Sequence, residues 1–310
     1  MSGLEYNDRA APFDTTRAPP DYATMFPELF AVHVRELRLD QETQIVENSK
    51  SYIYQYKDHY AASIRRIDAL KEIETMRSLR ELSIPVLGYV LGNDGWDIGY
   101  IMPLASSVPT NGSIAQKRDF MNQMIMLVEG LHKQRVLHGD IKLANFLFYN
   151  QRIWLCDFEE SQSIDNPGPP LSATQRYRPP WRVRKELCED TDPPLSIDDD
   201  WYGLGLSIWE LFTGHLVYED LDGVEVEEGY IVEGYVVDVE EAADPEAVAT
   251  IWRYIREGSR GLMGPESPVY RVTGPPHEGL STSQYFRGLE ARIAQRILRQ
   301  EPSVVPWNNA

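Results

Sequence analysis

The spacing of apolar residues divides the chain into a strand-rich first third and a helix-rich remainder. Short alternating runs rich in β-branched and aromatic residues predict five strands, at residues 33–39, 44–46, 51–57, 86–91 and 96–102. Apolar residues at helical spacing predict one helix at 61–82, between the third and the fourth strand. The turn sequence G-N-D-G at 92–95 predicts that the last two strands form a hairpin.

A polar turn between two apolar strands, V-L-H-G-D-I-K-L-A-N-F-L-F at residues 136–148, lies at the centre of the second part. A further strand at 152–156 follows a two-residue turn and predicts a hairpin with the strand before it. Four helices are predicted around this region, at 118–134, 200–214, 245–256 and 283–299. The second of them is apolar on nearly every face, which is typical of a buried helix.

The polar turn carries side chains of three chemical kinds at fixed spacing. Asp140 supplies a carboxylate, Lys142 a cation and Asn145 an amide, and Asp157 follows the next strand. Because the two strands form a hairpin, we expect Asp140 and Asp157 to hang from adjacent loops. Carboxylate and amide oxygens bind Mg²⁺ and a cation neutralises phosphate, so this set suits a polyphosphate and its metal.

The pattern H-x-D-x-K-x-x-N followed by D-F resembles the catalytic loop and the metal loop of the protein kinase family, Ser/Thr type. The resemblance covers about residues 33–300 and is most specific between 136 and 214. It implies an α+β fold with two lobes, a small β-rich N-lobe at 31–103 and a larger helical C-lobe at 104–310. Residues 1–30, rich in Pro, Asp and Thr, are predicted to be a flexible arm.

The resemblance implies a role for each polar residue of the turn. Asp140 corresponds to the base that accepts the proton of the substrate hydroxyl, and Lys142 to the cation that neutralises the transferring phosphoryl group. Asn145 and Asp157 correspond to the ligands of Mg²⁺. Asp200, at the start of the apolar helix, corresponds to the acid that ties down the catalytic loop.

The resemblance also implies a nucleotide site in the first third of the chain. Glu72 corresponds to the helix carboxylate that pairs with a phosphate-binding lysine, and Lys57, fifteen residues earlier, has a spacing that suits this lysine. Lys50 is a weaker candidate, and the alternative is that Lys57 and Glu72 are ordinary surface charges. Met102 corresponds to the gatekeeper of the adenine pocket, and Ala105 to the residue whose amide binds adenine.

The segment that leads to Trp181 resembles the substrate-positioning loop of kinases. Thr174 corresponds to the threonine of the Ser/Thr type that contacts the catalytic lysine, here Lys142, and the alternative is a plain loop threonine. Trp181 stands where the family has the glutamate of A-P-E, and this exchange removes the usual ion pair between that glutamate and a late arginine.

Three departures from the family pattern concern the nucleotide and the regulation. No glycine occurs between Gly3 and Gly88, so the Gly-rich loop is absent, and V-E-N-S-K-S at 46–51 stands roughly in its place. The metal motif reads D-F-E from Asp157 instead of D-F-G, and Gly139 replaces the arginine that reads activation-loop phosphorylation. We therefore expect an altered nucleotide lid and no phosphorylation switch. These departures are similar to those of divergent kinase-like proteins of filamentous fungi.

Charge and composition narrow the range of partners. The net charge of −18 argues against broad nucleic-acid binding and against anionic membrane surfaces, and it allows basic substrates. The stretch 219–246 has many acids and no Lys or Arg, so it is either a solvated loop or a docking face for a basic substrate. Two cysteines, no apolar signal segment and no run of membrane-span length favour a cytoplasmic protein, with a nuclear location as the alternative.

Three functions are open from the sequence, and we expect the first. It is an ATP- and Mg²⁺-dependent phosphotransferase of the Ser/Thr kinase type, acting on a hydroxyl group of a protein or a small molecule. The second is a pseudokinase that serves as a binding or scaffold module, which the missing glycines and Glu159 favour. The third is a kinase-fold enzyme recruited to another group transfer in specialised metabolism, such as tRNA-dependent synthesis of an arginine-containing cyclodipeptide. Only this third hypothesis involves a nucleic acid, which would bind a basic strip of Arg176, Arg178, Arg182, Arg184 and Lys185.

Overall fold

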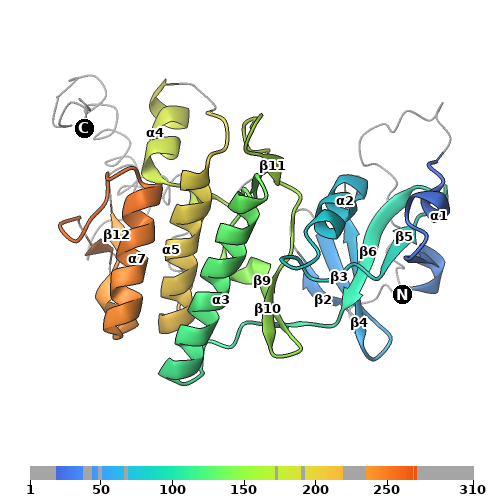
Figure 1. Ribbon diagram of the computed structural model, residues 1–310, viewed down its shortest axis with the longest axis horizontal. Helices are drawn as coiled ribbons and strands as arrows, with labels where there is room; N and C mark the ends of the chain where they lie inside the picture. Colours follow the sequence, from blue (N-terminus) through green and yellow to red (C-terminus); the bar gives the residue numbers. More distant parts are fainter. Residues whose placement is uncertain are drawn as a thin grey trace, which may run out of the picture. The chain divides into compact units, whose positions relative to one another are not determined.

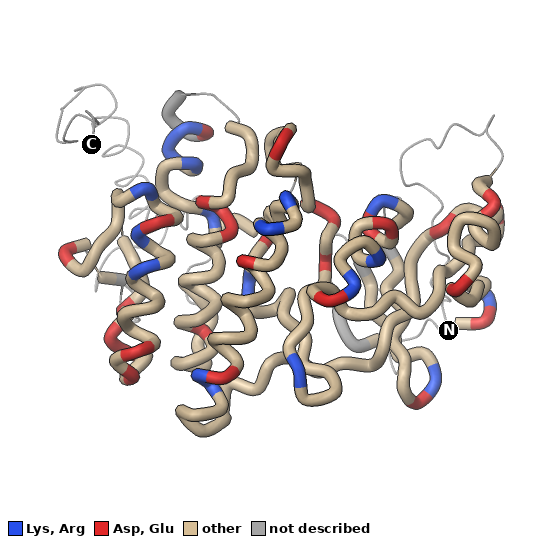
Figure 2. The backbone as a smooth tube through the Cα atoms, viewed as in Figure 1, with Lys and Arg blue, Asp and Glu red and all other residues tan. Residues whose placement is uncertain are grey.

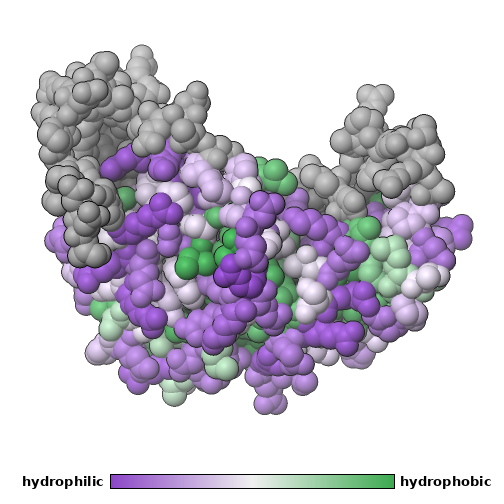
Figure 3. Space-filling view, turned by 45° about the horizontal axis from the view of Figure 1, so that its top comes forward, coloured by the Kyte–Doolittle hydropathy of each residue, from purple (hydrophilic) through white to green (hydrophobic). Residues whose placement is uncertain are grey.

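The structure is a computed structural model that describes residues 19–37, 44–47, 51–65, 69–171, 174–189, 193–218, 235–267 and 269–270. Several predictions fall outside these residues: the first part of the arm, residues 48–50 of the lid with Lys50, much of the acidic stretch, and the helix at 283–299. Figure 1 shows the described elements in chain order. In the view of Figure 3, hydrophilic side chains cover most of the described surface.

The chain forms two compact units, each of which is treated by itself. The sheet unit consists of Met1–Pro109, Asn122–Gln134 and Ala144–Ser161. The helical unit consists of Thr110–Met121, Arg135–Leu143 and Gln162–Ala310. The predicted lobe boundary between residues 103 and 104 stays a prediction.

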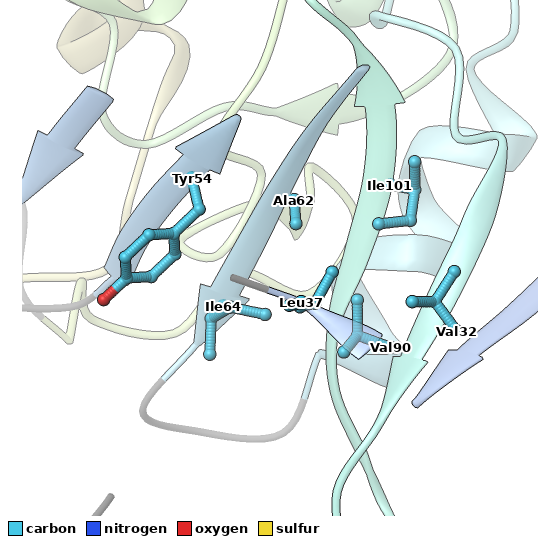
Figure 4. Packing of buried hydrophobic residues seen from close by; sticks show 7 residues of the cluster. All are labelled: Val32, Leu37, Tyr54, Ala62, Ile64, Val90 and Ile101. Atoms are coloured by element: carbon cyan, nitrogen blue, oxygen red, sulfur yellow. The ribbon is translucent and has the colours of Figure 1, made fainter. Parts of the chain in front are cut away.

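A six-stranded sheet in the order β1-β5-β6-β4-β3-β2 forms most of the sheet unit. Its strands are β1 Phe30–His33, β2 Gln44–Glu47, β3 Ser51–Tyr56, β4 Tyr60–Arg65, β5 Gly88–Leu91 and β6 Asp97–Pro103. β1 runs parallel to β5, and the other neighbours are antiparallel. Residues of the strands, together with Leu37 after β1, bury one apolar cluster (Figure 4), made of Val32, Leu37, Tyr54, Ala62, Ile64, Val90 and Ile101.

The predicted helix at 61–82 is wrong over its first turns. Residues 61–65 belong to β4, which pairs with β3 and β6, and helix α2 covers only Leu70–Ser78. The run A-A-S-I fits a strand as well as a helix, and pairing on both edges decides for the strand. Ala62 and Ile64 then enter the apolar cluster from the same face of β4.

The described part of the predicted flexible arm is folded. Helix α1, Tyr22–Met25, precedes β1, and the 3-10 helix η1, Val34–Glu36, follows it. Tyr22 and Phe26 are buried, and the hydroxyl of Tyr22 donates a hydrogen bond to the carboxylate of Asp97. The prediction failed here because two buried aromatic residues outweigh a composition that is otherwise typical of loops.

The sheet unit also contains a three-stranded sheet in the order β10-β9-β7. Its strands are β7 Ser106–Ser107, β9 Phe146–Tyr149 and β10 Arg152–Leu155. β9 and β10 form the predicted hairpin, whose turn residues Asn150 and Gln151 have φ values of 51° and 61°. Positive φ at both central residues is the tight turn that matches the twist of a hairpin. Helix α3, Ile114–Lys133, contributes residues to both units.

Helices dominate the described part of the helical unit: α4 Pro180–Glu189, α5 Ile197–Thr213 and α7 Pro245–Gly258. α5 and α7 lie side by side (Figure 1). α5 is buried over most of its length, as its apolar pattern predicts. The ammonium group of Lys117 donates a hydrogen bond of 2.8 Å to the carbonyl oxygen of Phe212, which satisfies one of the last carbonyls of α5.

Short elements complete the helical unit and lead into its loops. β8 Val136–Leu137 pairs with β11 Gln162–Ser163, and β12 Val236–Val237 pairs with β13 Val269–Tyr270. The 3-10 helices are η2 Leu143–Asn145, η3 Gln175–Tyr177 and η4 Val239–Ala242, of which η2 continues into the sheet unit. Within the described residues, no helix is long and apolar enough to cross a membrane.

Candidate active site

The loop after β8 is fixed by a buried acid of α5. Asp200, in the first turn of α5, accepts hydrogen bonds from the backbone N–H groups of His138 and Gly139, both at 2.9 Å. Gly139 has a φ of 82°, a left-handed conformation that glycine adopts without strain. The tie between Asp200 and this loop, which the sequence predicts, is therefore present.

Close packing of α5 against the same loop requires a glycine. A Cβ atom at Gly203 would lie 2.3 Å from the carbonyl oxygen of Ile141. Ile141 stands between Asp140 and Lys142 in the chain. The surface of α5 therefore sets the height of the loop that carries both of these residues.

Asp140, Lys142 and Thr174 form one hydrogen-bonded group in the helical unit. The ammonium group of Lys142 donates to Oδ2 of Asp140 at 2.6 Å and to Oγ1 of Thr174 at 2.8 Å. The backbone N–H of Thr174 donates to Oδ1 of Asp140 at 2.8 Å. The structure thus brings together the three predicted catalytic residues, and Thr174 makes the predicted contact with the lysine.

The carboxyl group of Asp140 keeps its charge although it is buried. Burial raises its pKa, but the charge and hydrogen bond of Lys142, together with the hydrogen bonds of Thr174, lower the pKa below its usual value. The group is therefore a carboxylate at neutral pH, with one oxygen near a cation. Such a group orients and accepts a hydrogen bond from a hydroxyl group.

A second buried pair follows Thr174 and was missed by the sequence analysis. The hydroxyl of Tyr177 donates to Oε1 of Glu210 at 2.7 Å, and the backbone N–H of Val217 donates to the same oxygen at 2.8 Å. Burial raises the pKa of Glu210 to about 6. The one signal in the sequence is an acid, Glu210, within an otherwise apolar helix. The pair attaches η3, directly after Thr174, to α5.

In the sheet unit, Glu72 joins α2 to the segment that carries Asp157. Glu72 is buried, and its Oε1 accepts hydrogen bonds from the hydroxyl of Tyr100 and from the backbone N–H of Phe158, each at 3.1 Å. Phe158 is fully buried, and Asp157 before it has a left-handed φ of 64°. Asp157 thus has a strained backbone conformation, and the buried Phe158 next to it is held by Glu72. Such backbone strain is typical of functional loops.

The structure does not bring Lys57 and Glu72 together. Lys57 lies in the turn between β3 and β4 with a φ of 57°, and its side chain is exposed. Its ammonium group lies 4.7 Å from the ring centroid of Tyr56, its neighbour in the chain. The predicted pair rested on spacing alone, and the hairpin turn directs Lys57 to solvent instead of towards α2.

Asn145 and Asp157 occupy the same end of the β9–β10 hairpin. Phe146 pairs with Leu155, and the backbone N–H of Cys156 donates to the carbonyl oxygen of Asn145 at 3.0 Å. An amide and a carboxylate are oxygen ligands of the kind that Mg²⁺ prefers, so these two residues fit that metal. Among the described residues, no cluster of three or more His, Cys, Asp or Glu side chains could hold a metal ion by itself. A metal held here therefore needs ligands from phosphate or water as well.

The two residues predicted to contact adenine lie near the end of β6. Met102 is buried and pairs with Ala61 of β4. Ala105 follows β6 and is partly exposed, and the backbone N–H of Leu104 between them donates to the carbonyl oxygen of His59 at 2.8 Å. At the end of β6 the chain passes from the buried Met102 to the partly exposed Ala105. Backbone N–H and C=O groups in such a segment can form hydrogen bonds with a planar base.

The predicted basic strip is largely used within the protein, although Figure 2 shows Lys and Arg gathered on α4. Arg176 donates to the carbonyl oxygen of Val217 at 2.9 Å, Arg178 pairs with Glu186, and Arg182 pairs with Asp199. Three of its five residues thus serve internal contacts. This leaves little of the strip for a nucleic-acid backbone.

Comparison with known proteins gives one family model and several curated relatives. Residues 44–251 match the family model described as protein kinase domain. The chain is 27% identical over 137 residues to serine/threonine-protein kinase 1 of Heliothis zea nuclear polyhedrosis virus, which covers 44% of this chain and 46% of that protein. It is 21% identical over 219 residues to serine/threonine-protein kinase MPS1 of Encephalitozoon cuniculi, which covers 66% of this chain and 37% of that protein. The chain thus matches less than half the length of these curated relatives.

Proposed function

The chain belongs to the protein kinase domain family, and on this premise we propose that it is a phosphotransferase of the Ser/Thr kinase type. It transfers the γ-phosphoryl group of ATP to a hydroxyl group of a protein or a small molecule, with Mg²⁺ as the cofactor. The observation that carries this proposal is the group of Asp140, Lys142 and Thr174, in which a buried carboxylate keeps its charge beside a cation.

Asp140 acts on the attacking hydroxyl group. Its carboxylate accepts a hydrogen bond from that hydroxyl, aligns the oxygen with the phosphorus atom, and takes the proton as the new O–P bond forms. A carboxylate with a lowered pKa is a weak base. This suits a loose transition state, in which the proton leaves only after the oxygen has begun to bond to phosphorus.

Lys142 acts on the group that is transferred. An ammonium group has three protons, and two of them are donated to Asp140 and Thr174. The third is available to an oxygen of the phosphoryl group, where the charge of the lysine stabilises the negative charge of the transition state. Thr174 keeps the flexible lysine side chain in one conformation.

The metal and the nucleotide bind through residues of the sheet unit. Asn145 and Asp157 would hold Mg²⁺, and a bound Mg²⁺ would supply positive charge for the phosphates and for the leaving group. Met102 and Ala105 line the adenine. Because Lys57 is exposed and Glu72 binds Tyr100 and Phe158, we expect weaker binding of ATP than in a kinase with a lysine–glutamate pair. The glycine-free lid acts in the same direction.

One observation favours a second candidate, a pseudokinase that serves as a binding module. It is the exposed position of Lys57, which withdraws a phosphate-binding cation from Glu72. The third hypothesis, a tRNA-dependent group transfer, loses support because Arg176, Arg178 and Arg182 serve internal contacts. We also propose that the substrate carries a hydroxyl group and basic residues or groups.

The proposal is tested with the full chain, ATP labelled in the γ position, and the variant Asp157→Asn. We expect Mg·ATP to raise the unfolding temperature of the wild type and label to move to an added Ser/Thr peptide mixture. Asp157→Asn loses both effects, because an amide binds Mg²⁺ less well than a carboxylate. Asp58→Asn, the same exchange at an exposed turn of the sheet unit, keeps both.

The outcomes separate the candidates. A thermal shift with Mg·ATP and no transfer of label favours the pseudokinase. No shift and no transfer contradicts the proposed function. Equal behaviour of Asp157→Asn and the wild type contradicts the assignment of the metal ligand.

A further inference from the structure

Three consecutive aspartates open α5, and each one holds a different part of the helical unit. Asp198, Asp199 and Asp200 all lie in the first turn of the helix. Asp200 binds the loop that carries Asp140, as described above. Asp198 and Asp199 have partners outside that loop.

Asp199 holds an arginine that is almost completely buried. Arg182 of α4 is 1% exposed, and its guanidinium group donates to the two carboxylate oxygens of Asp199 at 2.5 and 2.9 Å. The same guanidinium donates to the carbonyl oxygens of Pro193 and Pro194 at 2.6 and 2.9 Å. A buried cation with this many partners fixes the start of α4 against the start of α5.

Asp198 holds a second arginine, which lies on the ring of Trp181. Nε of Arg260 donates to Oδ2 of Asp198 at 2.7 Å, and the guanidinium carbon lies 3.7 Å from the centroid of the indole ring. The guanidinium carbon of Arg182 lies 5.0 Å from the same centroid. The indole N–H donates to the carbonyl oxygen of Gly258 at 2.9 Å. The side chain of Trp181 therefore has a cationic neighbour held by each of the first two aspartates.

Trp181 is directly connected to the segment that follows Thr174. The carbonyl oxygen of Pro179 accepts hydrogen bonds from the backbone N–H groups of Arg182 and Val183, at 3.0 and 3.2 Å. Trp181 lies in this first turn of α4 and is 6% exposed. A shift of the indole would therefore move the end of the segment 174–180, which begins with Thr174.

We propose that Trp181, Arg260 and Asp198 form a positioning clamp that replaces the glutamate–arginine ion pair lost at this site and sets the position of residues 174–180. The proposal rests on the proposed phosphotransferase function. The clamp holds the substrate segment on the same helix turn that holds the catalytic loop through Asp200. The segment 174–180 and the loop with Asp140 are therefore both held by the first turn of α5, although residue 181 carries no charge.

The test uses the full chain in three variants: Trp181→Leu, Arg260→Met and the double variant. If the two side chains act through each other, each single variant raises the KM for a Ser/Thr peptide mixture by about 10-fold. The KM for ATP stays within about 2-fold, and the double variant is no worse than the poorer single variant. A purely structural role would lower stability without this split between the two KM values.

Arg253→Met is the matched control. Arg253 lies on α7, its guanidinium carbon is 5.0 Å from the ring centroid of Tyr254, and it pairs with the exposed Glu257. The substitution is the same as at Arg260 and removes the same kind of contact from another ring. We expect it to leave both KM values unchanged.

A second measurement keeps the clamp testable if the wild type transfers no phosphoryl group. Backbone amide exchange of residues 174–183 becomes faster in Trp181→Leu and Arg260→Met and stays unchanged in Arg253→Met. Because the side chain of Arg260 is 41% exposed, its variant folds even if Trp181→Leu does not. The clamp is overturned if the effects of the single variants multiply in the double variant, if Arg253→Met has the same effect, or if neither KM nor exchange changes.

Discussion

Two buried carboxyl groups of the helical unit show how neighbours decide a protonation state. Asp140 and Glu210 are 5% and 4% exposed, and burial raises the pKa of both. Asp140 has an ammonium group at 2.6 Å, and its pKa ends below the usual value. Glu210 has a hydroxyl and an amide as its nearest donors, and its pKa ends at about 6. At neutral pH both groups are mostly ionised, but Glu210 takes up its proton at about pH 6, whereas Asp140 stays ionised to below its ordinary pKa of 3.8, which matches its proposed contact with substrate.

Glu210 gives a stability change with pH of definite sign. Its pKa is 4.5 as an ordinary glutamate and about 6 in the folded protein, so the folded state binds its proton more tightly between these values. The free energy of unfolding should therefore fall by about 2 kcal/mol as pH rises from about 4.5 to about 6. In Glu210→Gln this part of the fall should disappear, because the amide does not titrate.

Urea unfolding of the wild type and of Glu210→Gln at several pH values between 4 and 7 measures this difference. Asp140 does not interfere, because its pKa is lowered from 3.8 and its stabilising effect is lost only at lower pH. The same dependence on pH in both proteins would show that Glu210 is not the group responsible.

At the scale of elements, α5 is the part against which the catalytic loop is built. Its first turn binds the loop through Asp200, and one turn later Gly203 lets the loop approach. A buried helix in this role has to be apolar for burial and small at one position for contact. Both features can be seen in the sequence D-W-Y-G-L-G-L, although only the first was used there.

Gly203→Ala should be strongly unfavourable, although alanine is the better helix former by about 1 kcal/mol. The added methyl group would lie 2.3 Å from a backbone oxygen of the loop, so either the helix or the loop has to move. We expect a loss of about 1–3 kcal/mol in the free energy of unfolding, together with reduced phosphotransfer.

Chemical unfolding and an activity assay measure this effect. Gly168→Ala is the matched control in the same unit, because its new methyl group would meet its nearest atom at 3.5 Å, an ordinary contact. If both variants are equally stable, the close approach of α5 and the loop does not matter.

The N-terminal segment has a comparable role for α2 in the sheet unit. Arg77 of α2 pairs with Glu28, and its guanidinium carbon lies 4.6 Å from the ring centroid of the buried Phe26. These contacts fix α1 and the chain after it to the helix that carries Glu72. The segment therefore belongs to the fold of this unit.

Arg77→Ala should lower the unfolding temperature by about 2–4 °C, because it removes an ion pair and a ring contact together. Arg80→Ala, an exposed arginine three residues further along, should have a smaller effect. Calorimetry measures both temperatures, and equal shifts would mean that the contacts of Arg77 with the N-terminal segment contribute nothing.

For the whole molecule, the features that depend on one short segment could be predicted from the sequence. The predictions failed for features that depend on contacts between residues far apart in the chain. The turn with Asp140, Lys142 and Asn145 was found because its residues lie within one short segment. The first turns of the predicted helix at 61–82 are in fact the strand β4. Its apolar residues fit the period of a helix as well as that of a strand, and only the pairing with β3 and β6 decides between the two. Lys57 was predicted to pair with Glu72 from its spacing in the sequence. The spacing contains no information on the turn between β3 and β4, which exposes Lys57.

Other parts of the site could not be found from the sequence, because they join residues far apart in the chain. The bond between Tyr177 and Glu210 spans 33 residues, and the contact between Trp181 and Arg260 spans still more. The residue types of these two pairs do not indicate from the sequence that they are in contact. The fungal origin, the cytoplasmic or nuclear location and the docking role of the acidic stretch stay predictions.

The most direct test of the central claim compares Asp140→Asn with the wild type in the transfer of label from γ-labelled ATP. An asparagine fills the same space but cannot accept the proton, so turnover should fall by about 10²–10⁴-fold. Binding of Mg·ATP, measured by its thermal shift, should remain. Turnover equal to that of the wild type would contradict the role of Asp140, and with it the proposed phosphotransferase mechanism.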